Sequence, residues 1–195
     1  MNVRSFCALA LFTAAPAAGQ GSAAPSAFST VTGRVGALHE TVDGRLRQLY
    51  RPSTGFALEL STPFDLGQLS VALERSTFRG VEPEPHPDFR GTLALVAWRM
   101  PLPTVGPLTL AGGVHAGIMQ FSFEDPAIDP GLRKERELVL GVNALGSARL
   151  TQNLSAFMAA EYSHVWLRVP VHVMPISVGI GYTISSPEWL RDFLR

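Results

Sequence analysis

The chain has 195 residues, enough for one domain of ordinary size, with a formal net charge of zero and one cysteine, Cys7. The balanced charge gives no general reason to expect nucleic-acid binding, and the lone cysteine excludes a disulfide framework and a cysteine-based metal site. Charged residues make up only 16% of the chain, few for a soluble surface, yet after residue 19 no apolar run approaches the ~20 residues that a membrane-spanning helix needs.

The first residues predict an export signal. Arg4 precedes an apolar segment, residues 6–15, and the small residues 17–19 then provide a cleavage site before Gln20. The apolar segment is too short to serve as a membrane anchor. We therefore expect a signal peptide over residues 1–19, which carries Cys7 away, and a flexible lead-in over residues 20–29, rich in Gly, Ala, Ser and Pro.

Eight later segments alternate apolar side chains with small or polar ones, the period-two pattern of a β-strand. They are residues 31–39, 55–62, 68–78, 91–100, 108–123, 137–150, 153–168 and 171–184. Long connections follow the first, third and fifth segments and short ones the second, fourth and sixth, although the last connection, at Val169 and Pro170, is also short. This alternation is typical of a barrel with long loops at one end and short turns at the other. No stretch before Ser185 shows a sustained helical period.

The segment 171–184, VHVMPISVGIGYTI, shows most clearly how the two faces differ. One face is bulky from His172 to Ile184, whereas the other carries small residues such as Ser177 and Gly179. Bulky apolar residues outside and small or polar ones inside suit a lipid-facing wall around a narrow interior.

The outward face of the segment 91–100 is ambiguous. Leu93 and Leu95 compete there with Val96 and Trp98 for the outside of the wall, because both sets are bulky and apolar.

A polar residue, a glycine, an aromatic and a final aliphatic residue end the last segment, at Ser177, Gly179, Tyr182 and Ile184. This series resembles the terminal-strand signal by which insertion machinery recognises bacterial outer-membrane barrels. Over residues 30–184 the chain resembles the small outer-membrane barrels of the OmpA transmembrane-domain and OmpX type. The resemblance implies an all-β, eight-stranded antiparallel up-and-down transmembrane β-barrel in the Gram-negative outer membrane. It also implies membrane lipid, lipopolysaccharide and the barrel-insertion machinery as partners, and no nucleic acid; a protein partner at the surface stays open.

In such barrels polar and charged side chains fill the interior. The residues expected in this lumen charge network are Glu59, Glu74, Glu161, Arg34, Arg149, Asn143 and His115, with Arg99 as a further candidate. Because unpaired buried charges are costly, the three glutamates should lie within reach of Arg34 or Arg149. The glutamates could form a proton or ion path, but a salt-bridge plug is the favoured interpretation for a closed barrel of eight strands.

Two patterns suggest chemistry of other kinds. His115 could bind a metal, but its strand face carries no second histidine, so we expect neither a metal nor a cofactor. Ser163 beside His164 suggests a hydrolase, since some barrel enzymes deacylate lipid A with Ser, His and an acid. Adjacent strand residues point to opposite faces, however, so this pair cannot form a nucleophile–base contact.

Six basic residues fall in the predicted long loops: Arg45, Arg47, Arg51, Arg133, Lys134 and Arg136. They could grip lipid phosphates or be solvated loop charges, and the acidic residues among them favour the second interpretation.

Residues 185–195 predict a short amphipathic helix. Pro187 suits a first helical turn, and Trp189, Leu190, Phe193 and Leu194 fall on one side. We expect a helix over residues 187–194 at the membrane interface, with a helix folded against a sheet edge as the alternative.

The favoured function is a non-enzymatic, integral outer-membrane barrel with a structural, envelope or surface-interaction role. The first alternative is a lipid-modifying barrel enzyme of the lipid A deacylase kind, for which we find no convincing set of Ser, His and acid. The second is a secreted lipocalin-like carrier, which should place its bulky stripe inside rather than opposite its glutamates.

Overall fold

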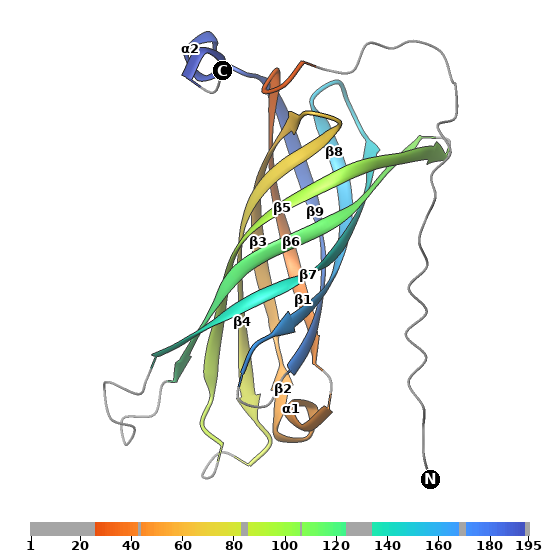
Figure 1. The fold of residues 1–195 in the computed structure, drawn as a ribbon. Helices are drawn as coiled ribbons and strands as arrows, with labels where there is room; N and C mark the ends of the chain where they lie inside the picture. Colours follow the sequence, from red (N-terminus) through yellow and green to blue (C-terminus); the bar gives the residue numbers. More distant parts are fainter. Residues whose placement is uncertain are drawn as a thin grey trace, which may run out of the picture.

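The computed structural model describes residues 26–42, 44–82, 86–105, 107–123, 134–167 and 171–193, which form mainly strands (Figure 1). The expected signal peptide, 1–19, and most of the expected lead-in lie outside these residues. In chain order the elements are β1 (Thr30–Val42), α1 (Gly44–Leu49), β2 (Tyr50–Pro52), β3 (Thr54–Phe64), β4 (Gly67–Gly80), β5 (Phe89–Val105), β6 (Leu108–Phe123), β7 (Lys134–Arg149), β8 (Leu154–Val165), β9 (Val171–Ser185) and α2 (Glu188–Phe193).

The sheet closes on itself. Each long strand pairs antiparallel with its sequence neighbours, and β1 pairs with β9 from Thr30 opposite Ser185 to Val42 opposite Val173. Within the described residues, β2 is the one strand outside the ring; it adds to the end of β4. Because a closed sheet has no edge, every long strand finds backbone partners on both sides. The predicted closed, eight-stranded antiparallel barrel is confirmed.

The two ends of the barrel differ (Figure 1). At the loop end, where β1, β4, β6 and β8 finish, the structure adds α1 and β2. At the turn end, β3 and β4 are joined by a two-residue turn at Asp65 and Leu66, with Phe64 paired to Gly67. Asp65 has a φ of 51°, the left-handed conformation that such tight hairpins need and that Asp tolerates. The tail with α2 follows β9 at this same end.

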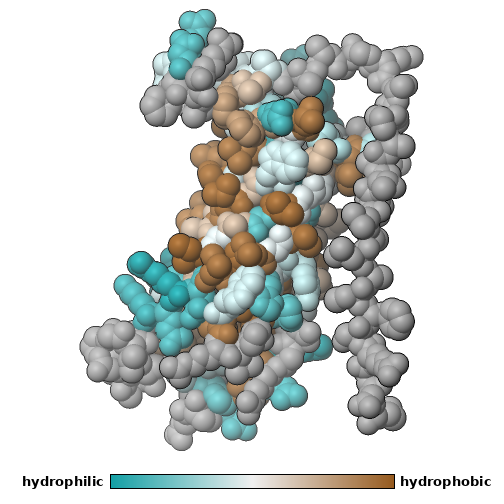
Figure 2. All heavy atoms as spheres, in the orientation of Figure 1, coloured by the Kyte–Doolittle hydropathy of each residue, from teal (hydrophilic) through white to brown (hydrophobic). Residues whose placement is uncertain are grey.

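The outer wall is apolar over its middle (Figure 2). Exposed aliphatic side chains on many strands form it, among them Leu60, Val114 and Ile180. The structure also decides which face of β5 points outward, which the sequence left ambiguous. Leu93 and Leu95 are 5% and 4% exposed, whereas Val96 is 52% exposed. Leu93 and Leu95 therefore face the lumen, and Val96 faces outward.

An aromatic cluster fills the loop end of the lumen. The rings of Phe78 and Phe89 stack with centroids 4.5 Å apart, and Phe121 meets Phe89 edge-on at 5.6 Å. Tyr50 of β2 packs against Phe89 at 4.8 Å, so the connection after β1 reaches into this cluster. The resemblance implied an interior filled by polar and charged side chains, but at this end strand parity places large apolar rings inside.

The structure differs from the sequence prediction at several element boundaries, of which the following bear on the loops. The first long loop contains α1 and β2, which are too short to show a periodic pattern. Strand β5 continues through Pro101 to Val105, and β7 begins at Lys134. Lys134 and Arg136 are therefore strand residues rather than loop residues. In the described part of the chain no helix is long and apolar enough to cross a membrane.

The tail carries α2 over Glu188–Phe193, inside the range 187–194 in which a helix was expected. Trp189 is exposed. The side chains of Leu190 and Phe193, and the whole of Leu194, lie outside what the structure describes, so the interfacial orientation of this helix stays a prediction.

Replacing Gly179 with Ala should destabilise the seam between β1 and β9. A Cβ at Gly179 would lie 2.0 Å from the carbonyl oxygen of Val35, so the two strands would have to separate. We expect a loss of about 2 kcal/mol or more in the free energy of unfolding, measured by urea titration of the barrel refolded in detergent. The control is Gly33→Ala, where the Cβ would meet only a Leu60 methyl at 3.6 Å. Equal midpoints for both variants would contradict this account.

Candidate functional site

The buried guanidinium of Arg99, on β5, is the centre of a charged layer across the middle of the lumen. Its side chain is 0% exposed, and its Nε donates to the Oδ1 atom of Asn143 on β7 at 2.8 Å. Its Nη1 lies 2.9 Å from Oε1 and 2.8 Å from Oε2 of Glu59 on β3. Its Nη2 lies 3.9 Å from Glu161 of β8, beyond hydrogen-bond distance. One arginine thus ties together strands from opposite sides of the barrel.

A second arginine, Arg34 of β1, extends this layer toward the turn end. Its Nη1 forms an ion pair with Glu59 and donates to the Ser61 hydroxyl at 2.7 Å. The amide of Gln68 donates to the same hydroxyl at 3.0 Å. Glu59 is therefore shared by two guanidinium groups, which fixes β1, β3 and β5 relative to one another.

A chain of hydrogen bonds runs from Arg99 to a serine. Because Arg99 donates to the Asn143 oxygen, the amide nitrogen of Asn143 points to His115, 3.4 Å from Nδ1. An amide nitrogen only donates, so Nδ1 accepts and Nε2 carries the proton. That Nε2 donates to Ser163 Oγ at 2.9 Å. Arg99 thereby sets the orientation of three neutral groups.

Several carboxyl oxygens lack such partners. The Oε2 atoms of Glu40, Glu74 and Glu161 are buried without a hydrogen-bond partner. Glu74 and Glu161, with Glu59 and Arg34, line a cavity of about 10 Å³. That volume fits about one water molecule beside Glu74 and Glu161; Glu40 does not line this cavity. The lumen layer thus holds Glu59, Glu74 and Glu161 against two guanidiniums, and Glu40 is a further buried carboxyl on β1.

On the turn side of the charged layer, the lumen opens into a cavity of about 310 Å³. Arg34 and Arg99 line it together with residues such as Gln68, Thr109 and Ser147. The charged layer therefore forms the floor of a vestibule at the turn end, whose lining mixes these polar residues with apolar ones such as Leu110 and Leu145, while the aromatic cluster occupies the loop end.

Five of the seven residues expected in the lumen charge network form the contacts described above: Glu59, Glu161, Arg34, Asn143 and His115. Of the three glutamates, however, only Glu59 reaches Arg34. Glu161 lies near Arg99 instead, at 3.9 Å, and Glu74 contacts neither expected arginine. Arg149 is exposed at the end of β7 and forms no ion pair with any of the glutamates. The expectation that Arg149 pairs with the lumen glutamates is therefore wrong. Because Arg149 lies at the end of its strand, its long side chain reaches solvent.

Two lumen residues are more central in the structure than their sequence pattern indicated. Arg99, expected only as a further candidate, is the central cation. Glu40, which was not among the expected lumen residues, is 4% exposed and lies on the inner face of β1. The signal for Glu40 was present in the sequence, since it shares its strand parity with Arg34.

Ser163, His115 and Glu161 have the residue types of a hydrolase triad. The Oε2 atom of Glu161 lies 3.8 Å from Nδ1 of His115, too far for a hydrogen bond, and Asn143 is nearer. Ser163 is 1% exposed and the His115 side chain 0%. A substrate carbonyl therefore cannot reach the hydroxyl in this arrangement. No group of three or more metal-ligating side chains occurs among the described residues.

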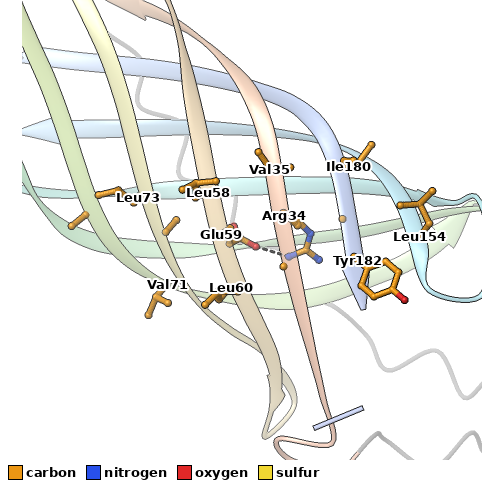
Figure 3. Close-up of a pocket in the computed structure, with 14 residues that line it drawn as sticks. Arg34, Val35, Leu58, Glu59, Leu60, Val71, Leu73, Leu154, Ile180 and Tyr182 are labelled. Carbon is orange, nitrogen blue, oxygen red and sulfur yellow. Dashed lines mark hydrogen bonds and ion pairs between the residues drawn. The ribbon is translucent and has the colours of Figure 1, made fainter. Parts of the chain in front are cut away.

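A separate groove of about 600 Å³ lies on the apolar outer wall (Figure 3). Leu58, Leu60, Val71, Ile180 and Tyr182 surround it, and the Arg34–Glu59 pair lies behind the strands that form its floor. Gly33 contributes to the hollow because it has no side chain between its cross-strand partners Leu60 and Tyr182. The groove presents hydrocarbon rather than catalytic groups.

A closed antiparallel barrel of eight long strands, with an apolar outer wall and a filled lumen, defines a class: the fold is that of the small outer-membrane barrels. The chain is similar to Neisserial surface protein A, with a TM-score of 0.63 and 16% identity over 81% of this chain and 99% of that one. It is similar to Ail of Yersinia pestis, solved in complex with a heparin analogue, with a TM-score of 0.54 and 18% identity over 80% and 98%. It is also similar to OprG of Pseudomonas aeruginosa, with a TM-score of 0.51 and 14% identity over 82% and 97%. No family model and no curated protein sequence matches the chain.

Two Glu→Gln substitutions separate paired from unpaired lumen carboxylates. Glu59→Gln should lower the free energy of unfolding by about 3 kcal/mol, because it removes the carboxylate that two buried guanidiniums share. Glu74→Gln should leave stability unchanged or raise it, since the Glu74 Oε2 atom has no partner. Urea unfolding of the refolded barrel, followed by tryptophan fluorescence, measures both. If both variants lost the same free energy of unfolding, ion pairing would not determine the effect of removing a lumen carboxylate.

Proposed function

We propose that the protein is an integral outer-membrane barrel without enzymatic activity, with a structural, envelope or surface-interaction role, whose lumen is closed to steady flow. The observation that carries this proposal is the pairing of an apolar outer wall with a lumen that is blocked at its loop end and across its middle. Exposed aliphatic residues of this number on one continuous surface favour burial in lipid. The fold shared with outer-membrane barrels supports the same placement.

Two different layers support the closed lumen. The Phe78, Phe89 and Phe121 rings block the loop end, and the layer around Arg99 crosses the middle. The cavity within the charged layer has room for about one water molecule. Ion passage would require breaking several charge-assisted hydrogen bonds and displacing packed rings.

Export by the signal peptide and recognition by the barrel-insertion machinery are part of this proposal. They rest on the residue patterns at 1–19 and at the end of β9, and lipopolysaccharide is the expected lipid neighbour. The lipid-modifying alternative loses support, because the nearest approach to a triad is buried in the lumen rather than on the lipid-facing wall.

Membrane fractionation and planar-bilayer recording test the proposal together. The full-length protein should appear in the outer-membrane fraction, migrate differently on gels before and after heating, and show little or no steady conductance. A variant with Glu59, Phe89 and Arg99 all changed to Ala should conduct, since it removes both layers. A matched variant of three outer-wall residues, Val96, Val114 and Ile118 to Ala, should stay closed. Steady conductance of the unmodified protein would refute the closed lumen, and recovery in a soluble fraction would refute the membrane placement.

We also propose that the tail lies at the interface on the turn side. Helices of this length are marginal in water, so α2 should depend on lipid or on the barrel for its order. Changing Trp189 and Phe193 together to Ser should increase protease cleavage within residues 186–195 of the reconstituted protein and leave heat-modifiable folding intact. Loss of folding in that variant would show that the tail belongs to the core instead.

A further inference from the structure

Six basic side chains lie on the outer face of the barrel at the loop end. We call them the basic girdle: Arg51, Arg75, Arg79, Arg90, Lys134 and Arg136, all of them exposed. Figure 2 shows hydrophilic side chains gathered at this end of the wall, beside its apolar middle.

Strand parity places the girdle on the outer face. Arg75 lies between Glu74 and Ser76, both of which are buried in the lumen. Arg79 follows buried Phe78, and Arg90 follows buried Phe89. The arginines therefore point away from the lumen, on the side that carries the aliphatic wall.

The strand register brings these cations together. Arg51 of β2 is paired with Arg79 of β4. Beyond β5, which carries Arg90, Gln120 of β6 stands opposite Arg136 of β7. The side-chain oxygen of Gln120 accepts a hydrogen bond from the Nε atom of Arg136 at 3.1 Å. Lys134 lies two residues before Arg136, on the same face of β7. The girdle thus covers one side of the barrel, from β2 and β4 across to β7.

Among the residues that the structure describes, few carboxylates face these cations from the elements around them. Glu135 and Glu137 of β7 are paired with Phe121 and Met119, whose side chains are buried, so both glutamates belong to the inner face. Asp88 lies at the edge, where its Oδ1 accepts a hydrogen bond from the backbone nitrogen of Gly80 at 3.0 Å. Arg90 also has an interaction of its own, so the girdle is not a set of unpaired cations.

The girdle lies directly against the apolar wall and at one end of it only. Arg75 is two residues from Leu73, and Arg136 is two residues from Leu138, both exposed on the wall. At the turn end, the outward positions of the described strands carry apolar residues such as Leu102, Leu108 and Leu150 and no cation. A soluble anion would need no such hydrocarbon surface beside its charges.

We propose that the basic girdle binds the phosphate groups of a phosphorylated membrane lipid whose acyl chains lie on the wall beside it. The inference rests on the membrane placement proposed above and adds the headgroup chemistry. Guanidinium groups match phosphate oxygens through paired hydrogen bonds, and five of the six cations are arginines. The row of charges next to the row of aliphatic residues matches the junction of headgroup and acyl chain.

The test reconstitutes the full chain in phosphatidylcholine nanodiscs that contain either lipid A or the same lipid A with its phosphates removed. Native mass spectrometry then measures how much lipid A each barrel retains. The unmodified protein should retain the phosphorylated form in preference. The double variant Arg75→Gln, Arg136→Gln should bind it roughly 25-fold more weakly, since each cation near a membrane surface contributes about five-fold. Retention should also fall as salt is raised.

The matched control removes two exposed cations outside the girdle, Arg47→Gln with Arg149→Gln, and should retain lipid A as the unmodified protein does. Equal retention of the two lipid A forms, or an unchanged double variant, would overturn the proposal. Displacement of lipid A by inositol hexakisphosphate at equal concentration would assign the girdle to a soluble polyanion and overturn it too. Failure of the protein to give a heat-modifiable band in any nanodisc would instead count against the membrane placement.

Discussion

Closure of the sheet between β1 and β9 is the constraint on which the rest of the molecule depends. In a lipid environment no water is available to backbone groups, so an open edge would leave a row of unpaired N–H and C=O groups. The seam runs the full length of β1, and its strands approach closely where Gly36 stands opposite Gly179. Once the ring is closed, every position on a long strand faces either the wall or the lumen, and no position is neutral.

The narrow lumen turns that constraint into a packing problem. Eight strands enclose a space that side chains must fill, and the chain solves the problem differently along the axis. Rings pack against one another at the loop end, where no partner charge is needed. In the middle, Arg99 and Arg34 converge on Glu59, so the most buried cations share a carboxylate. At the turn end the lumen keeps a cavity of about 310 Å³, lined by polar and apolar residues together.

The sequence predicted the fold well because the barrel needs little more than period two and the lengths of its connections. The inward position of Glu161 and the outward position of Tyr182 follow from parity alone. Contacts across the lumen do not, because they depend on the tilt and stagger of strands that are far apart in sequence. Arg99 therefore looked peripheral, and Arg149 looked central, although their positions in the structure are the reverse.

Short elements and strand ends were the other source of error. The helix α1 and strand β2 are held by packing of Leu46 and Tyr50 against the aromatic cluster, and so small a unit has no periodic signature of its own. The start of β7 was assigned to a loop because its charges look like loop residues. Their alternation becomes informative only when the partner strand is known, since Glu135 and Glu137 then fall on the inner face and Lys134 and Arg136 on the outer one.

The lumen network and the basic girdle are consequences of one register. On β4, Glu74 faces the lumen and the next residue, Arg75, faces outward beside the apolar wall. A slip of one residue would exchange them, placing a cation at the lumen position of Glu74 and a carboxylate on the outer wall. The same exchange would turn Leu73 inward and Ala72 outward. Charge of both signs on neighbouring positions therefore helps to specify the register, beyond what the aliphatic stripe does alone.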